Sequence, residues 1–276
     1  MKIAITGGNG RVGQAVIEAA LTQGHTVVSI DRLQLESELQ RSGVTYIQAD
    51  LTNYHAVEAA LSGCDGLIHL AAIPSPINLP DYEVHNNNVV ASYNALSAAA
   101  RLGICRICQA SSVNAIGVLF SRWPQYDYFP LDELHPTYNE DAYSLSKWIC
   151  EQQGDSIARR HDMITIATLR IQWVIEDISE ADAYRADPSN QRSAKNLWGY
   201  VRADALARAC LLSLTADFTG HEVFFITAPD TLMNIPSVEL KEIFFPDVPL
   251  RSEMIGNQAF FNCSKAQRLL GWQHDR

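Results

Sequence analysis

The fold is decided by the first thirteen residues, Met1 to Gly13, which read MKIAITGGNGRVG. Residues 2–6 are apolar, rich in β-branched side chains and too short for a helix, so they predict a buried strand. Three glycines and then a helical pattern follow, and this order of strand, glycine turn and helix is typical of dinucleotide-binding sites. In such a site Gly7 would allow a tight turn, Gly10 would let the pyrophosphate approach the backbone, and Gly13 would let the helix pack close to the strand. The start of the helix offers free N–H groups to phosphates. The alternative is a plain strand–turn–helix corner.

A second strand is predicted over residues 25–31, and it ends in an acid. Asp31 lies 18 residues beyond Gly13, where a carboxylate can accept hydrogen bonds from both ribose hydroxyls of an adenosine and would repel a 2′-phosphate. This position favours NAD over NADP as the cofactor. The neighbouring Arg32 would favour a phosphate, and a strand-end acid at a turn is the structural alternative.

Composition narrows the classes of protein to consider. The 276 residues, 47% hydrophobic, suffice for one large α/β domain, and a net charge of −10 without a Lys/Arg cluster argues against nucleic acid as a partner. No apolar run reaches the roughly 18 residues of a membrane-spanning helix, so no membrane partner is expected. Because the first strand starts at residue 2, we expect no signal peptide and a cytoplasmic protein.

The cysteines are expected to be free thiols that bind no metal. Two of them, Cys105 and Cys108, have C-x-x-C spacing, but they fall in a predicted strand, where positions three apart point to opposite faces. The other four cysteines are Cys64, Cys150, Cys210 and Cys263.

Strands and helices alternate along the first part of the chain. This alternation predicts an α/β fold, a Rossmann-type doubly wound parallel sheet with a small C-terminal substrate subdomain. The NAD-binding domain is expected over 1–171, with 200–228 returning to it, and the small substrate-binding or lid part over 172–199 and 229–276. The predicted strands are 2–6, 25–31, 44–50, 66–72, 104–112, 163–171 and 221–227, and the helices are 11–24, 53–61, 81–102, 140–161, 200–214, 237–244 and 264–270.

The carboxyl ends of parallel strands share one edge of the sheet, where ligands bind. Small residues after the fourth strand, Ala71 and Ala72, leave room to flank a nicotinamide, whereas His69 is expected to be a hydrogen-bonded core residue. The irregular segment 113–139 is long enough to suggest a function, and 176–195 has the composition of a mobile lid. The features expected at this edge are the glycine loop, Asp31, Asp50, Ala71, Ser112 and the residues after Arg170.

A catalytic group is predicted on the helix after the fifth strand. Tyr143 and Lys147 are four residues apart and therefore share a face. For Tyr143 to act as a base near neutral pH, its pKa must fall by roughly three units, about 4 kcal/mol, and a nearby lysine ammonium with a positive nicotinamide would lower it. Ser112, at a strand exit, would hold the substrate oxygen against the tyrosine. A Tyr-x-x-x-Lys pair that arises by chance is the alternative.

As a set, these motifs resemble the extended short-chain dehydrogenases/reductases of the NAD-dependent epimerase/dehydratase kind. The resemblance implies Ser112, Tyr143 and Lys147 as the catalytic trio, Asp50-Leu51 near the adenine, and Asn88 as a support of the active site. It also implies NAD as the cofactor and a homodimer formed through the helices after strands four and five. The expected cofactor-binding residues are Gly7, Asn9, Gly10, Arg11, Val12, Gly13, Asp31, Arg32, Asp50, Leu51, Leu70, Ala71, Ala72, Asn88, Tyr143 and Lys147.

Within that family the length and layout are most similar to uronate dehydrogenases. That group carries Asn-His directly after the serine pair, where this chain has Val113 and Asn114, so the substrate does not transfer directly. We expect a small carbohydrate-like substrate, bound by Ser75, Ser112, Asn114 and Arg192, with Lys195 as a second candidate for an anionic group. The expected reaction is hydride transfer to or from a sugar-like alcohol or sugar acid. The alternatives are an epimerase or dehydratase that retains its NAD, and a non-catalytic NAD sensor.

Overall fold

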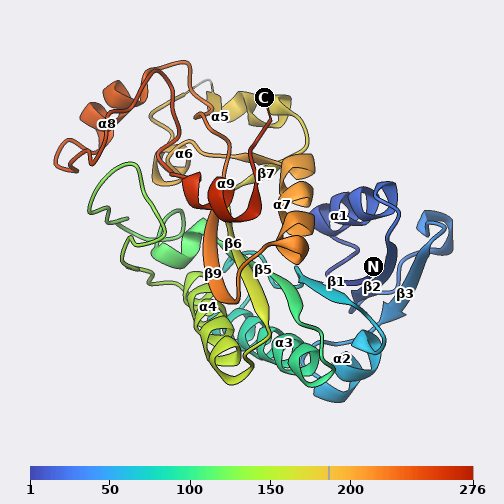
Figure 1. The fold of residues 1–276 in the computed structure, drawn as a ribbon. Helices are drawn as coiled ribbons and strands as arrows, with labels where there is room; N and C mark the ends of the chain where they lie inside the picture. Colours follow the sequence, from blue (N-terminus) through green and yellow to red (C-terminus); the bar gives the residue numbers. More distant parts are fainter. Residues whose placement is uncertain (186, 276) are drawn as a thin grey trace.

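The computed structural model describes residues 1–185 and 187–275, and within them one parallel sheet forms the centre of the molecule (Figure 1). Its strand order is β3-β2-β1-β4-β5-β6-β9. The order reverses between β1 and β4, and in such sheets ligands bind beyond the strand ends at this point. The strands are β1 (Lys2–Thr6), β2 (Thr26–Asp31), β3 (Val44–Gln48), β4 (Gly66–His69), β5 (Arg106–Ser112), β6 (Thr165–Ile171) and β9 (Gly220–Ile226).

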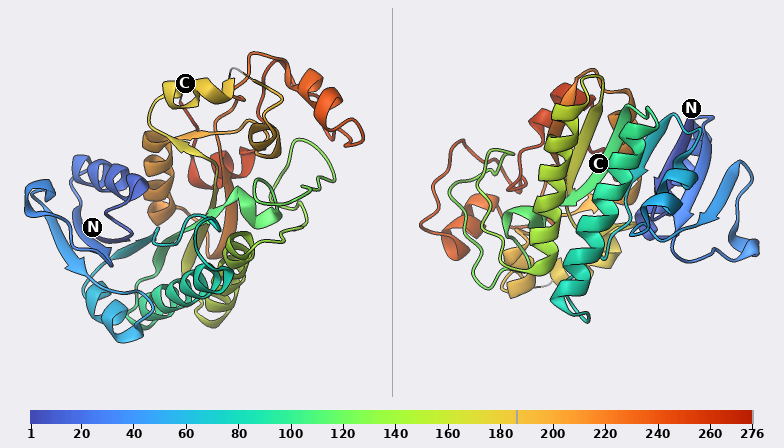
Figure 2. Two further views of the ribbon diagram at one scale, coloured as in Figure 1. Left: turned by 180° about the vertical axis from the view of Figure 1, so that it is seen from behind. Right: turned by 90° about the horizontal axis from the view of Figure 1, so that it is seen from below.

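Helices cover both faces of the sheet, so the predicted Rossmann-type fold is confirmed (Figures 1 and 2). Alternate residues of β1 enter two cores: Ile3 and Ile5 pack with α1 and α7, whereas Ala4 packs on the side of α2, α3 and α4. This alternation is the consequence of the two-residue period of a strand that is buried on both faces. These helices are α1 (Arg11–Thr22), α2 (Tyr54–Leu61), α3 (Asp81–Arg101), α4 (Ala142–Arg160) and α7 (Ala203–Thr215).

A third apolar cluster adjoins the end of β9, through Phe225, and gathers residues of the long irregular segment and the C-terminal part. Phe129, Trp198 and Phe260 are buried there, and the rings of Phe129 and Phe260 are 4.8 Å apart. Helix α9 and Trp272, although they belong to the C-terminal part, pack in the main core against α7 and β9. The division of the chain into two domains stays a prediction. The remaining elements are η1 (Ser37–Leu39), η2 (Val113–Ile116), β7 (Val174–Ile175), η3 (Ile178–Ala181), α5 (Asp182–Arg185), α6 (Gln191–Lys195), β8 (Val201–Arg202), α8 (Ser237–Phe244) and α9 (Ser264–Leu270).

Several predicted boundaries move by a few residues for local reasons. The helix predicted from residue 140 begins at Ala142, because the Asp141 carboxylate accepts the Ser144 N–H and caps it. The helix predicted from residue 200 begins at Ala203, because residues 201 and 202 pair as β8. Strands β3 and β4 end two or three residues early, which leaves 49–51 and 70–72 as loops at the ligand edge. The segment predicted as a lid, 176–195, contains the short helices η3, α5 and α6.

The chain's cysteines are free, as expected, although Cys105 lies just before β5 and not within it. No helix of the described residues is both long and apolar enough to cross a bilayer.

Candidate active site

The glycine loop has the geometry of a phosphate cradle. A Cβ on Gly13 would lie 2.3 Å from the Gly7 carbonyl oxygen, and one on Gly7, whose φ is +70°, would lie 2.9 Å from the Ala71 backbone. Side chains at these positions are therefore excluded. Gly10 caps α1 without any side-chain hydrogen bond, so the first N–H groups of the helix stay open to a ligand. These features fit a dinucleotide pyrophosphate, as the sequence predicts.

Asp31 lies beside this loop at the carboxyl end of β2. Its carboxylate accepts the N–H groups of Asn9 and Leu33, each at 3.2 Å, and the Asn9 amide donates to the Leu33 carbonyl at 2.7 Å. These bonds orient the carboxylate toward the cradle, where a ribose would be placed. Hydrogen bonds from Thr52 lower the pKa of Asp50, and the charge of the exposed Arg32 adds a smaller lowering.

Asp50 and Leu51 stabilise the turn that follows β3. Asp50 accepts the backbone N–H and the hydroxyl of Thr52, both at 2.8 Å, which fixes the turn. Leu51 is buried, and its carbonyl accepts the Asn94 amide at 2.9 Å. Both residues lie at the predicted edge of the sheet, and their contact with adenine stays a prediction.

Thr6 and Asn88 organise the exit of β4. The Thr6 hydroxyl accepts the N–H groups of Leu70 and Ala71, at 3.2 Å each, and pairs with His69 Nδ1 at 2.8 Å. Burial lowers the pKa of His69 to about 3, so it is a neutral hydrogen-bonded core residue. Asn88 clamps the Ile73 backbone through bonds of 2.7 and 3.0 Å and also contacts Ser146, a geometry that favours its support role.

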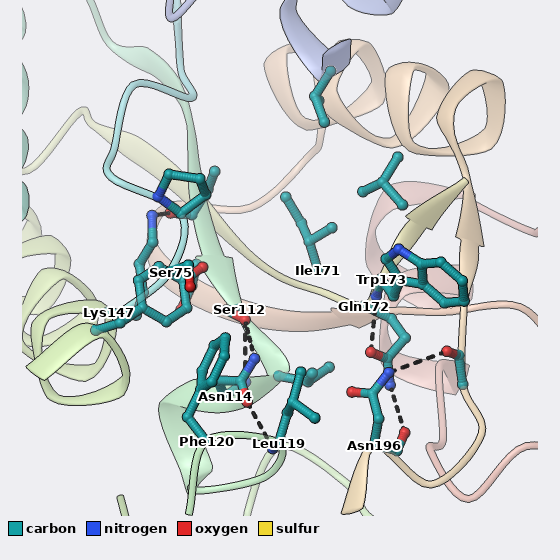
Figure 3. A pocket seen from close by; sticks show the side chains of 18 of the residues that line it. Ser75, Ser112, Asn114, Leu119, Phe120, Lys147, Ile171, Gln172, Trp173 and Asn196 are labelled. Carbon is teal, nitrogen blue, oxygen red and sulfur yellow. Dashed lines mark hydrogen bonds between the residues drawn. The ribbon is translucent and has the colours of Figure 1, made fainter. Parts of the chain in front are cut away.

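The predicted catalytic residues meet at one cavity of about 540 Å³ at the carboxyl ends of β4, β5 and β6. Ser112, Tyr143 and Lys147 all line it, and each is buried. The Lys147 ammonium donates to the Ala110 carbonyl at 2.9 Å and lies 6.0 Å from the centre of the Tyr143 ring. Figure 3 shows Lys147 and Ser112 around this cavity.

In the protein without a bound cofactor, the pKa of Tyr143 is raised, whereas the sequence analysis predicts that it must be lowered for catalysis. Burial raises the pKa of Tyr143 to about 12, against a smaller lowering by its hydrogen bond with Ser112. Burial also lowers the pKa of Lys147. The hydroxyl of Tyr143 is therefore protonated at neutral pH until further positive charge or a hydrogen-bonding ligand enters the cavity.

Of the predicted substrate residues, Ser75, Asn114 and Arg192 line the same cavity. Lys195 does not, because its ammonium donates to the carbonyls of Ser121 and Arg122 at 2.8 and 3.0 Å. This lysine therefore ties α6 to the long irregular segment and is not available for a substrate anion.

Sequence reasoning missed most of the far wall of the cavity. Trp173 and Tyr184 stack edge to face at 4.8 Å there, and the Ser193 hydroxyl is buried without a hydrogen-bond partner within the described residues. The available signal was residues 171–174, which read IQWV where the resemblance leads one to expect small residues and a proline. Further lining residues that the sequence did not single out include Leu119, Phe120, Ile171, Gln172, Val174, Asn196, Trp198, Gly199 and Leu232, several of which Figure 3 labels.

Arg11 links the glycine loop to the segment that the sequence marks as a lid. Its guanidinium lies 2.6 Å from a Glu180 carboxylate oxygen and 3.8 Å from one of Glu176, and it also donates to the Val174 carbonyl at 3.3 Å. The cavity reaches Arg11 and Val12 on this side. The side chain of Arg11 thus bridges the cofactor end and η3.

A buried ion pair supports the strand ends beneath the site. Arg170 on β6 makes two bonds to the Glu151 carboxylate of α4, at 3.0 and 2.9 Å, and the Ser111 hydroxyl donates to the same carboxylate at 2.6 Å. Both charged side chains are almost wholly buried. The pair fixes β5, β6 and α4, which carry Ser112 and Tyr143.

Comparison with known proteins places the chain in a family. The sequence model of the NAD dependent epimerase/dehydratase family matches residues 3–175. L-arabinose 1-dehydrogenase (NAD(P)(+)) of Haloferax volcanii is 29% identical over 208 residues, 73% of this chain and 76% of that protein. Uronate dehydrogenase of Agrobacterium fabrum is 32% identical over 115 residues, 42% of this chain and 39% of that protein.

Among solved structures, MoeE5 in complex with UDP-glucuronic acid and NAD superimposes with a TM-score of 0.73 at 20% identity, covering 100% of this chain and 94% of the other. This likeness shows the shared fold. Because the family model matches residues 3–175, the chain is a member of the NAD-dependent epimerase/dehydratase family, an enzyme with NAD as its cofactor.

Proposed function

We propose that the protein is an NAD-dependent oxidoreductase that transfers a hydride between the nicotinamide and a sugar-like alcohol or sugar acid. The observation that carries this proposal is the meeting of three buried side chains, Ser112, Tyr143 and Lys147, in one cavity that also reaches the start of α1. A hydroxyl, a phenol and an ammonium in that arrangement can hold an alcohol oxygen and move its proton.

In this proposal Ser112 donates a hydrogen bond to the substrate oxygen, and Tyr143 takes the proton during oxidation or returns it during reduction. NAD, when bound, would supply the acceptor or donor of the hydride and, in its oxidised form, a positive charge near the tyrosine. Lowering the pKa of Tyr143 from about 12 to near 7 requires roughly 7 kcal/mol of preferential phenolate stabilisation. Lys147, 6.0 Å from the ring, supplies part of this stabilisation.

The substrate end of the cavity suits a polar molecule with an anionic group. Arg192 lines the cavity, and its guanidinium makes no hydrogen bond or ion pair to the described residues, so a carboxylate can pair with it. The unpartnered Ser193 hydroxyl and the Asn196 amide offer bonds to sugar hydroxyls, and Ser75 lies on the opposite wall. Two relatives are named for sugar substrates, arabinose and uronate, and of these the uronate carries a carboxylate.

An epimerase or dehydratase that keeps its NAD is the second candidate. The observation that favours it is the bridge from Arg11 to Glu180, at 2.6 Å, which joins the lid segment to the cofactor loop and would slow cofactor exchange. A tightly held cofactor suits a reaction that returns its hydride within one turnover.

The test is a panel of sugar acids, free sugars and nucleotide sugars, incubated with the enzyme and excess NAD. One NADH formed per substrate consumed supports the oxidoreductase. Product formed without NADH accumulation supports the epimerase or dehydratase instead. Arg192→Gln should raise KM for an acidic substrate by about 10-fold or more and change KM for its uncharged alcohol analogue little. An equal rise in KM for both substrates would show that Arg192 does not recognise the anionic group.

We also propose a homodimer formed through α3 and α4, in a cytoplasmic enzyme that binds no nucleic acid. Tyr82, Val90 and Tyr93 are exposed side chains of α3, and Leu145 is exposed on the adjacent α4. Large exposed apolar side chains on two adjacent helices favour a subunit interface there. A mass of one chain by light scattering at micromolar concentration would contradict the dimer, and no salt-dependent binding to DNA or RNA is expected.

A further inference from the structure

Two hydrogen-bond donors from one residue face the hydroxyl oxygen of Ser112. The backbone N–H and the side-chain amide of Asn114 both donate to Ser112 Oγ, each at 3.2 Å (Figure 3). Both residues are buried. The bond from the Asn114 N–H also caps η2, because Ser112 is the N-cap residue of this short helix.

The orientation of the Asn114 amide is fixed by its other end. Asn114 Oδ1 accepts the N–H of Leu119 at 2.8 Å, and only the oxygen of an amide can accept that bond. The NH₂ group must therefore point to Ser112. This assignment does not depend on a choice between two flipped amides.

A serine hydroxyl has one hydrogen to donate and two lone pairs that accept. Because Asn114 occupies both acceptor positions of Ser112, the remaining bond of this hydroxyl is a donated one. The Tyr143 phenol oxygen can receive this bond within the cavity, and so could the oxygen of a substrate once it is bound.

We propose that Asn114 is a positioning residue that fixes the Ser112 hydroxyl as a donor into the catalytic cavity. This inference rests on the proposed function and deepens it by giving Asn114 a role other than substrate contact. A donated bond strengthens when the receiving oxygen becomes charged, so it favours the phenolate of Tyr143 and an alkoxide-like substrate oxygen. If the hydroxyl could turn, it would accept the Tyr143 O–H and favour the neutral phenol.

The test is an ultraviolet titration of tyrosinate in the NAD-loaded enzyme, which requires no substrate. Subtracting the titration of Tyr143→Phe isolates the Tyr143 midpoint. The charged or titratable groups that bear on this residue are Lys147, Asp141 and Cys150, all from α4 and its cap, and the variants leave them intact. From other elements, Ser112 forms a hydrogen bond with Tyr143, and the centre of the Phe120 ring lies 5.7 Å from that of the Tyr143 ring.

Asn114→Ala removes the side-chain donor, and we expect the Tyr143 midpoint to rise by about one pH unit. Asn114→Asp keeps the acceptor for Leu119 but replaces the donor with a second acceptor, so it should raise the midpoint further. Each change is repeated in a Ser112→Ala background, where Asn114→Ala should have no effect and Asn114→Asp should show only the effect of its charge.

Equal shifts in the two backgrounds would overturn the proposal, because Asn114 would then act without Ser112. An unchanged midpoint in Asn114→Ala, in protein with the wild-type melting temperature, would overturn it as well. Failure of the proposed function looks different: Tyr143→Phe and Ser112→Ala would then leave turnover of the panel substrate unchanged, whatever Asn114 does.

Discussion

Glu151→Gln should destabilise the protein more than any exposed charge change of the same kind. Glu151 and Arg170 have side chains 2% and 7% exposed and are joined by bonds of 2.9 and 3.0 Å. Removing one partner of a buried ion pair leaves an uncompensated charge, at a cost of about 3–5 kcal/mol. Near 60 °C an unfolding entropy of about 2.1 cal/mol/K per residue gives roughly 0.6 kcal/mol/K for 276 residues, so Tm should fall by about 5–9 °C.

The assay is thermal unfolding followed by circular dichroism, with Glu58→Gln as the matched control. Glu58 pairs with Arg101 at the same distance, 2.9 Å, but the Arg101 side chain is 72% exposed. The control should lose less than about 1 kcal/mol, or under 2 °C. The double variant Glu151→Leu with Arg170→Met should lose less than Glu151→Gln, because no charge stays unpaired. A drop for Glu151→Gln no larger than that of the control would refute the reasoning.

Three further predictions concern the cofactor and the proton. Gly13→Ala should abolish NAD binding measured by calorimetry, because its Cβ would lie 2.3 Å from the Gly7 carbonyl oxygen; unchanged affinity would contradict the cradle. Asp31→Ala should weaken the binding of NAD more than that of NADP, since the proposed role of this carboxylate is to accept hydrogen bonds from the ribose hydroxyls, and its charge would repel a 2′-phosphate; an equal loss of affinity for both cofactors would contradict this role. Alcohol oxidation should accelerate as pH rises, because burial raises the pKa of Tyr143 and leaves its base form scarce at neutral pH; a chemistry-limited rate that is flat from pH 6 to 10 would count against this base.

Local patterns in the sequence were sufficient to predict the sheet and its ligand edge. The short apolar run 2–6, followed by glycines at 7, 10 and 13, predicted β1, the cradle and α1 together, because each depends only on neighbouring residues. The four-residue step from Tyr143 to Lys147 likewise placed both side chains at one cavity, as helix geometry requires.

Properties that depend on distant segments were not predictable in the same way. The raised pKa of Tyr143 follows from burial by several elements, so the sequence suggested only the lowering effect of Lys147. Lys195 looked available for an anion, yet carbonyls more than seventy positions earlier occupy its ammonium. The Glu151–Arg170 pair and the unpartnered Ser193 hydroxyl also depend on tertiary packing that no local pattern reports.

The central claim is that Tyr143 moves the proton in an NAD-dependent oxidation, and Tyr143→Phe tests it most directly. The variant removes one hydroxyl from a buried ring, so NAD affinity and melting temperature should stay close to wild type. NADH formation with the substrate found in the panel should fall by at least about 100-fold, the usual contribution of a general base. An NADH formation rate equal to that of the wild type would contradict the account.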